Sequence, residues 1–393
     1  MGQDVWDSIE GYDASYFQRS CISQSIMYEP QISIIVPSRG RPDRLATLIR
    51  HLAEQDLDAG QAFELIVALD GDAAEVDALP QSSDFALHYI DLPQVGIAAA
   101  KNAAASRAVG QVLLFVNDDI EPEHDFVREH LAAQIAGHRV VLGDSPWRRY
   151  ADQAVLDELV ARTRMIFFYG DLHAHKPCNF RHAWNLNLSV NRELLGARAG
   201  APFDERFRPC MYEDIEMAYR IVGERNHVTY HPAARARHNH RYTLAGYFER
   251  EAMLGVMAPE LFRANPSCFE AIFRCGLDAL VAAARHGVAL DVPDALRVLD
   301  TLMGWTGRPA QDCPTEQLDV LYHLHLPLKR RAFRLGLLAG ARRPAPPWPR
   351  RWDIARGALH NDEVFGDLIG QRSAEEDVAG AAIAAKQPVQ ASW

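Results

Sequence analysis

Residues 112–119 read VLLFVNDD, an apolar run that ends in three polar residues. A short run with branched side chains is typical of a strand buried on both faces of a parallel sheet. Two earlier stretches repeat this arrangement, because ISIIV at 32–36 leads into the polar loop 37–42, and FELIVAL at 63–69 leads into Asp70-Gly71-Asp72. In open α/β sheets, ligands bind at the carboxyl ends of the strands. We therefore expect these polar loops to form one ligand-binding edge.

Helical stretches alternate with the strands. Apolar residues recur at helical spacing in 43–55, and the alanine-rich stretch 97–109 follows a further expected strand at 86–90. This alternation predicts an α/β fold, in which helices flank a mostly parallel sheet with right-handed crossovers. Residues 242–330 are expected to be largely helical.

Changes in composition divide the 393-residue chain into four parts. We expect an N-terminal extension (1–30), a catalytic domain (31–240), a helical C-terminal region (241–330) and a basic, proline-rich segment with its tail (331–393). The catalytic domain is expected to have a nucleotide-sugar half (31–122) and an acceptor half (123–240).

The overall charge excludes some classes of function. A net charge of −11 argues against a nucleic-acid partner, since phosphate binding requires a clustered basic field. No signal peptide or spanning apolar run is evident, and the six cysteines are scattered without CxxC pairs. These features indicate a cytoplasmic protein.

Four polar features suggest chemistry, and each has an ordinary structural alternative. Asn117-Asp118-Asp119 places at least one carboxylate at the ligand edge, or caps a following helix. Lys101 faces a phosphate or an aspartate, or is simply solvated. Glu213-Asp214 opens a helix, where it holds a rigid base or only complements the helix dipole. His238 follows a strand, where it is a metal ligand, a phosphate contact or a surface histidine.

In combination these motifs resemble the family 2 glycosyltransferases of the GT-A fold. IIVPSR at 34–39 resembles the family's opening strand and nucleotide loop, and LDGD at 69–72 its second-strand acidic motif. Residues 96–115 resemble its G-x-A-x-A-R-N stretch with the following strand. Asn117-Asp118-Asp119 falls on its DxD motif and Glu213-Asp214 on its ED motif. The motifs keep the family order over the region from Ile32 to about Gly255.

The resemblance implies roles for individual residues. Asp119 matches the metal-binding last aspartate of DxD, and His238 a histidine that completes the metal site in some members. Asp214 matches the general base, and Glu213 would orient that base or contact the acceptor. Asn117 stands in place of the usual first aspartate. The remaining implied donor contacts are Pro37, Ser38, Arg39, Asp70, Asp72, Lys101 and Asp118. Trp184 either stacks on an acceptor sugar or belongs to the core.

The resemblance implies a hexosyltransferase that moves a sugar from a nucleotide-diphosphate sugar to an acceptor hydroxyl, with inversion and with Mn²⁺ or Mg²⁺ as cofactor. A glycan, glycolipid or glycoprotein acceptor in bacterial surface glycan or glycoconjugate synthesis is expected. The alternatives are a nucleotidyltransferase of similar fold, for which Ser38-Arg39-Gly40-Arg41 is a faint match, and a non-catalytic sugar-binding protein on the same scaffold.

The stretch from Lys329 to Trp352 interleaves basic residues with leucine, phenylalanine and tryptophan in a chain that is acidic overall. Basic residues attract anionic lipid headgroups, and tryptophan favours the membrane interface. This composition predicts peripheral contact with the inner face of the membrane. The alternative is a basic segment that packs on the rest of the protein or mediates self-association.

Overall fold

A computed structural model describes residues 20–21, 29–71, 81–82, 84–208, 210–222, 227–288, 292–342 and 351–371. The chain forms two compact units that interleave along the sequence. The first comprises Met1–Ser145, His173–Glu205 and Arg220–His238, and the second comprises Pro146–Leu172, Arg206–Tyr219 and Asn239–Trp393. This division differs from the contiguous domains expected above, because two stretches of the expected catalytic domain group with the C-terminal helices.

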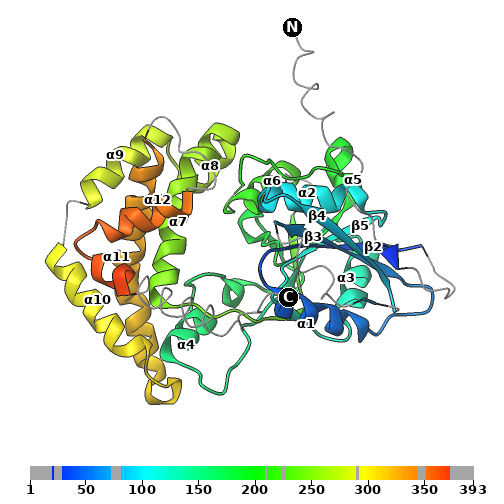
Figure 1. The fold of residues 1–393 in the computed structure, drawn as a ribbon, viewed down its shortest axis with the longest axis horizontal. Coiled ribbons are helices and arrows are strands. Elements are labelled where there is room, and N and C mark those ends of the chain that lie inside the picture. The colour runs from blue at the N-terminus through cyan, green and yellow to red at the C-terminus, as the bar shows by residue number, and fades with distance from the viewer. Residues whose placement is uncertain are drawn as a thin grey trace, which may run out of the picture. The chain divides into compact units, whose positions relative to one another are not determined.

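The first unit contains the sheet (Figure 1). Its parallel part has the order β4-β3-β2-β5 and consists of β2 (Ile32–Ser38), β3 (Phe63–Asp70), β4 (Ala86–Leu92) and β5 (Val112–Val116). All residues of β2, β3 and β5 are buried, as the continuous apolar runs predict for central parallel strands. A short strand β1 (Ser20–Cys21) pairs antiparallel with β4.

Helices pack on both the parallel part of the sheet and the strands beyond β5. They are α1 (Pro42–Ala53), α2 (Ile97–Arg107) and α3 (Phe126–Ile135), and a short α5 (Arg192–Leu195) follows further along the chain. Helix α2 packs on β2 and β3, whereas α3 packs on β7 and β10. Helix α1 buries Leu45, Leu48, Ile49 and Leu52, the residues whose spacing predicted the helix.

Beyond β5 the pairing is mixed, in the order β5-β9-β7-β10-β6. The strands are β6 (Ile120–Pro122), β7 (Val140–Asp144), β9 (Asn187–Asn191) and β10 (Val228–His238), and β8 (Pro177–Cys178) pairs with β10 off this path. Strand β9 runs antiparallel to β5 and β7, and β6 runs antiparallel to β10. The strand that was expected to precede His238 is the end of β10, which also includes His238.

Strand β10 carries a bulge. His231 pairs with Gly143 of β7, but the next pair is Arg235 with Asp144, so three residues of β10 have no counterpart on β7. A Cβ on Gly143 would lie 2.2 Å from the Ala234 carbonyl oxygen, so only glycine fits beside the bulge. After the bulge the side chains alternate, with Ala234, Ala236 and His238 buried and the two arginines between them exposed.

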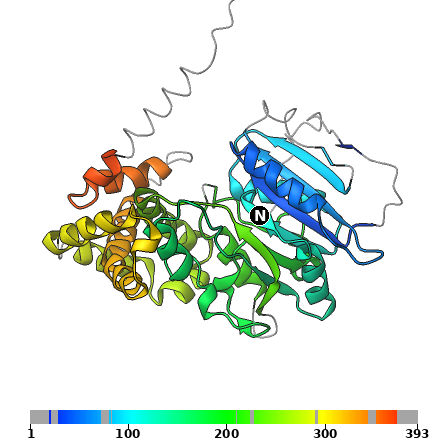
Figure 2. The same ribbon diagram turned by 90° about the horizontal axis from the view of Figure 1, so that it is seen from below.

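The second unit is helical (Figure 2). Its helices are α4 (Val155–Arg162), the start of α6 (Glu213–Ile221), α7 (Leu244–Ala264), α8 (Pro266–Phe273), α9 (Leu277–Val288), α10 (Val292–Thr306), α11 (Thr315–Gly340) and α12 (Arg351–His360). Helices α7 and α11 pack backbone to backbone, because a Cβ on Gly336 would lie 1.8 Å from the Ala252 carbonyl oxygen. Helix α11 runs through the boundary expected at residue 330.

The expected α/β class with a helical C-terminal region is confirmed. One local alternative is not realised, because Asn117-Asp118-Asp119 is followed by strand β6 and caps no helix. In the parts of the chain that the structure describes, no helix has the length and apolar character needed to cross a membrane.

Candidate active site

Polar side chains from the carboxyl ends of β2 and β5 meet in the first unit. The Ser38 hydroxyl, at the end of β2, donates to Oδ2 of Asp118 at 2.7 Å. Asp118 follows β5 and is fully buried, while Asp119 is 4% exposed. Burial raises the pKa of Asp118 to about 6, and the charge of Asp119 adds to this effect while Arg41 and Ser38 oppose it. Two adjacent buried carboxylates need a counter-charge.

Arg41 supplies that charge. Its Nη1 donates to Oδ2 of Asp119 at 2.7 Å, and its Nη2 pairs with Oδ1 of Asp118. Burial opposes the positive charge of Arg41, but the two carboxylates outweigh burial and raise its pKa above the usual value. The guanidinium therefore lies where a cation is electrostatically favoured.

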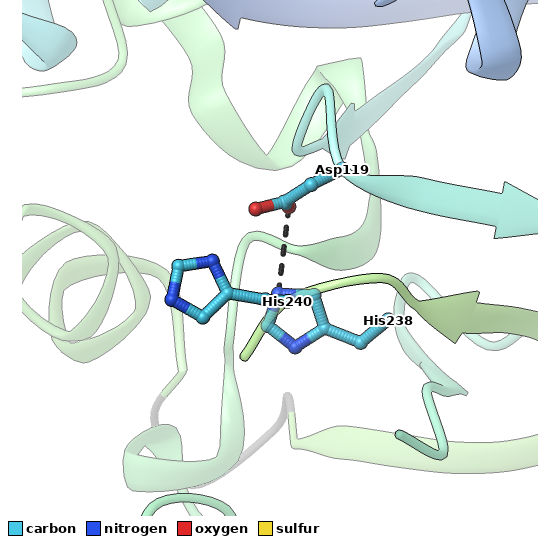
Figure 3. Close-up of side chains that lie close together, drawn as sticks. All are labelled: Asp119, His238 and His240. Carbon is cyan, nitrogen blue, oxygen red and sulfur yellow. Dashed lines mark ion pairs between the residues drawn. The ribbon is translucent and has the colours of Figure 1, made fainter. Parts of the chain in front are cut away.

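His238 approaches Asp119 from the neighbouring strand. The antiparallel register of β10 on β6 pairs His238 with Ile120, the residue after Asp119. Its Nε2 lies 3.4 Å from Oδ1 of Asp119, and His238 is 5% exposed (Figure 3). The pairing of β10 with β6 thus joins two residues that are far apart in sequence.

His240 lies two residues after His238 and completes a group that could hold a metal ion (Figure 3). One ligand atom from each of Asp119, His238 and His240 lies within 4.8 Å of the others. A carboxylate and imidazole nitrogens are common ligands of divalent metals. Asp119 and His238 were predicted from the sequence and His240 was not, although the stretch His238-Asn239-His240 was a visible signal.

Two other predicted donor residues, Asp70 and Lys101, lie near the start of α2. Asp70 ends β3 and is 6% exposed, and its Oδ1 accepts the Gly96 N–H at 3.1 Å and also that of Val95. Gly96 has φ 95°, which favours glycine at the entry to the helix. Lys101 is 2% exposed, with Nζ 5.1 Å from the centroid of the Phe203 ring. The solvated alternative for this lysine is therefore wrong.

Glu213 and Asp214 open α6 in the second unit, as predicted. Glu213 is 5% exposed, and Oδ1 of Asp214 accepts the Ile215 N–H at 2.8 Å. The three preceding residues all have positive φ, with 139° at Cys210, 72° at Met211 and 69° at Tyr212. Such backbone costs about 1–3 kcal/mol per residue outside glycine and clusters at functional sites. The Tyr212 hydroxyl anchors this turn by donating to the Leu254 carbonyl at 3.1 Å.

The remaining predicted residues are less involved in these contacts. Pro37 is a buried residue of β2, Arg39 is exposed and Asn117 is half-buried. Trp184 is 6% exposed and stacks edge-on against His182 at 5.6 Å, a degree of burial that favours its core alternative. Asp72 lies outside the described residues.

No pattern in the sequence predicted the buried polar network that lies beneath the site. Nε2 of His130 contacts Oδ1 of Asn187 at 2.7 Å, and the amide of Asn187 donates to the Ala234 carbonyl at 3.0 Å. Burial lowers the pKa of His130 to about 4, so this ring is neutral at pH 7. The network ties α3 and β9 to the bulge of β10, and so helps to place His238.

Part of the chain matches a known protein family. The family model described as glycosyl transferase family 2 matches residues 33–194, which include β2, the Asp118–Asp119 pair and β9. This region of the chain is similar to glycosyl transferase family 2. The match ends before Glu213 and His238, so it does not test their roles.

Three curated relatives of the family 2 region illustrate its context. An uncharacterised glycosyltransferase, YfnE of Bacillus subtilis, is 29% identical over 120 residues, 30% of each chain. The O-antigen biosynthesis protein RfbC of Myxococcus xanthus is 27% identical over 49% of this chain and 16% of its own length. The pre-mycofactocin glycosyltransferase of Mycobacterium tuberculosis is 24% identical over 60% of this chain and 48% of its own. The chain thus spans less than half the length of each.

Two solved structures show a distant likeness. The mannosyltransferase PcManGT from Pyrobaculum calidifontis, in complex with GDP-Man and Mn²⁺, has a TM-score of 0.43 at 17% identity and covers 94% of this chain and 91% of its own. S. aureus TarS 1-349 in complex with UDP has a TM-score of 0.42 at 15% identity and covers 78% and 90%, respectively.

Proposed function

We propose that this protein transfers a sugar from a nucleotide-diphosphate sugar to an acceptor hydroxyl. The observation that carries the proposal is the group of Asp119, Arg41 and His238, of which Asp119 and Arg41 lie in the region that matches the family 2 glycosyltransferases. In displacement at an anomeric carbon, the C–O bond to the β-phosphate breaks and negative charge develops on the diphosphate. A site for sugar transfer needs cationic groups that stabilise this charge.

Asp119 and His238 are the residues that would hold a divalent cation, with His240 as a further ligand. The fit rests on the donor set, since a buried carboxylate oxygen lies within 3.4 Å of an imidazole nitrogen. Mg²⁺ prefers oxygen ligands only, so the imidazole favours Mn²⁺ of the two candidates. When bound, such an ion neutralises charge on the leaving diphosphate.

Arg41 has two roles in this proposal. Without a metal, its guanidinium balances the charges of Asp118 and Asp119. When a cation takes over that balance, the guanidinium is released to bind a diphosphate, for which its planar fork of donors is suited. The metal and the donor would then each favour binding of the other.

On the acceptor side, Asp214 is proposed as the general base. Its carboxylate would take the proton of the acceptor hydroxyl as the acceptor oxygen forms the new bond to the anomeric carbon. A single displacement of this kind inverts the anomeric configuration. The carboxylate of Glu213 would orient the acceptor, and the start of α6 holds both side chains in a fixed place.

The proposed biological setting is the synthesis of a bacterial surface glycan or glycoconjugate. The Myxococcus xanthus relative is an O-antigen biosynthesis protein, which supports a glycan, glycolipid or glycoprotein acceptor. The identities of the acceptor and of the donor sugar can both be determined by direct assay.

A panel assay tests the reaction against its alternatives. The full chain is incubated with UDP-, GDP- and dTDP-sugars and Mn²⁺, with and without EDTA, and release of nucleoside diphosphate is measured. We expect metal-dependent release from one class of donor. Release of pyrophosphate from a nucleoside triphosphate and a sugar phosphate would instead identify a nucleotidyltransferase. Donor binding without turnover, with any acceptor tried, would favour the sugar-binding alternative.

A further inference from the structure

A cavity of about 430 Å³ lies in the second unit among α7, α8, α9 and α11, helices that are labelled in Figure 1. Its volume is within the range of small-molecule sites, about 300–1,000 Å³. The lining is mostly apolar and consists of Phe273, Leu280, Ala283, Ala284, Leu326, Phe333 and Leu337. Nothing in the proposed sugar transfer uses it.

The shape of the cavity follows from the two faces of α11. Toward α7, a Cβ on Gly336 or Gly340 would lie 1.8 or 2.4 Å from a carbonyl oxygen, which leaves no space between these helices. The cavity is therefore not a sign of loose packing along the α7–α11 contact. It lies along a separate stripe of α11, in which Leu326, Phe333 and Leu337 recur at helical spacing.

Three basic residues of α11, Lys329, Arg330 and Arg334, also line the cavity. Its one acidic lining residue is Glu251, which is 1% exposed and pairs with Arg250 at 2.7 Å and with Lys329 at 3.7 Å. Lys329 thus already has a carboxylate partner, which it shares with Arg250.

The other two cations have no such partner. Arg330 is exposed, and Arg334 donates through Nη1 to the Gly287 carbonyl at 3.2 Å. Among the described residues, neither arginine forms an ion pair with a carboxylate. The apolar cavity therefore has an excess of positive charge.

Other parts of the basic stretch from Lys329 to Trp352 serve internal packing. Arg331 is buried and binds both carboxylate oxygens of Asp362, at 3.0 and 2.7 Å, and Arg351 pairs with Glu260 at 2.8 Å. Arg343, Trp348 and Arg350 lie outside the described residues. Arg330 and Arg334 are thus distinguished from these arginines by lining a cavity.

We propose that this cavity binds an anionic amphiphile, with an alkyl or isoprenyl chain in the apolar interior and a phosphate head on Arg330 and Arg334. Burial of the chain removes apolar surface from water, and arginine binds phosphate through paired charge-assisted hydrogen bonds. The same chemistry is offered by a phospholipid in a membrane and by a free lipid phosphate. Binding here is separate from the sugar-transfer site and does not depend on the proposed function.

The test titrates the full chain with dodecyl phosphate below its micelle concentration, by calorimetry. We expect saturable binding with one site, and at least about tenfold weaker binding of dodecyltrimethylammonium. The double variant Arg330→Gln/Arg334→Gln should weaken dodecyl phosphate binding at least about tenfold, and Ala283→Trp should block it by filling the cavity. Arg285→Gln on α9, which does not line the cavity, is the matched control.

Thermal unfolding checks that each variant is folded. Absence of saturable binding, equal affinity for the cationic amphiphile, or equal loss in the Arg285→Gln control would overturn the proposal. Co-sedimentation with phosphatidylglycerol vesicles then separates the sources. Vesicle binding that is lost in the double variant identifies a membrane phospholipid, whereas binding of soluble dodecyl phosphate alone identifies a free lipid phosphate.

Discussion

The two acidic motifs are held in place by different means. Asp118 and Asp119 are fixed by side chains from distant parts of the chain, namely Ser38, Arg41 and His238. Glu213 and Asp214 are fixed by local backbone, the three left-handed residues before α6. The first motif is therefore sensitive to the charge of its partners, and the second to the conformation of a turn. Substitutions of these two kinds should separate their contributions to the reaction.

The largest effect is expected from Asp119→Ala. Removing the proposed metal ligand should abolish metal-dependent turnover of the donor and weaken Mn²⁺ binding, measured by electron paramagnetic resonance, by about 10²-fold or more. Asp125→Ala, at a half-buried aspartate before α3, is the control. Full activity of the Asp119 variant, or of the wild type in EDTA, would refute the metal assignment.

Asp214→Asn should have the next largest effect. The amide keeps the shape of the side chain but cannot take a proton, so transfer should fall by about 10²-fold or more. Donor affinity, measured by calorimetry, should stay nearly unchanged. If donor affinity falls as far as the transfer rate, Asp214 belongs to the donor site and its assignment as base is wrong.

Arg41→Met tests whether a guanidinium competes with the metal. Without donor, Mn²⁺ should bind about three- to tenfold more tightly, because Asp119 no longer has an internal cation as partner. The nucleoside diphosphate should bind about tenfold more weakly. Arg50→Met, at an exposed arginine of α1, should do neither. Weaker Mn²⁺ binding in the Arg41 variant would mean that Arg41 organises the site and does not compete for it.

The smallest effect concerns the turn before α6. At φ 72°, Met211→Gly should be more stable than Met211→Ala by about 1 kcal/mol, because only the alanine keeps a Cβ in the left-handed region. Urea unfolding measures the difference. If Met211→Gly also lowers transfer while donor binding is kept, the rigidity of the turn places Asp214. Equal stability of the two variants would indicate that the turn is not strained.

The buried strands were the most predictable part of the molecule. Strands β2, β3 and β5 and helices α1 and α2 lie within about two residues of their expected bounds, because a continuous apolar run or a helical apolar stripe is a local signal. The pairing of Asp119 with His238 was anticipated through family resemblance, not through local pattern. Its physical cause is the register of β10 on β6, which no local pattern reveals.

The sequence could not predict which side chains or backbone groups each polar residue of the site contacts. Arg41 was noted only as part of a faint phosphate-loop match, yet its guanidinium contacts Asp118 and Asp119. Asp70 was expected to contact the donor, but its Oδ1 accepts backbone N–H groups before α2. Both outcomes depend on contacts between residues far apart in sequence. The interleaving of the two units along the sequence also depends on contacts between residues that are far apart in sequence.

The bulge in β10 determines which residues of the strand beyond it, including His238, face the interior. Beyond it, buried and exposed positions alternate, so a single inserted or deleted residue in 232–234 would turn His238 outward and bring the long cation of Arg237 inward. In evolution, the length of this segment should then be as constrained as the identity of the histidine. In the exposed loops of the same unit, the chain length does not decide which side chains face the interior, so these loops are free to vary in length.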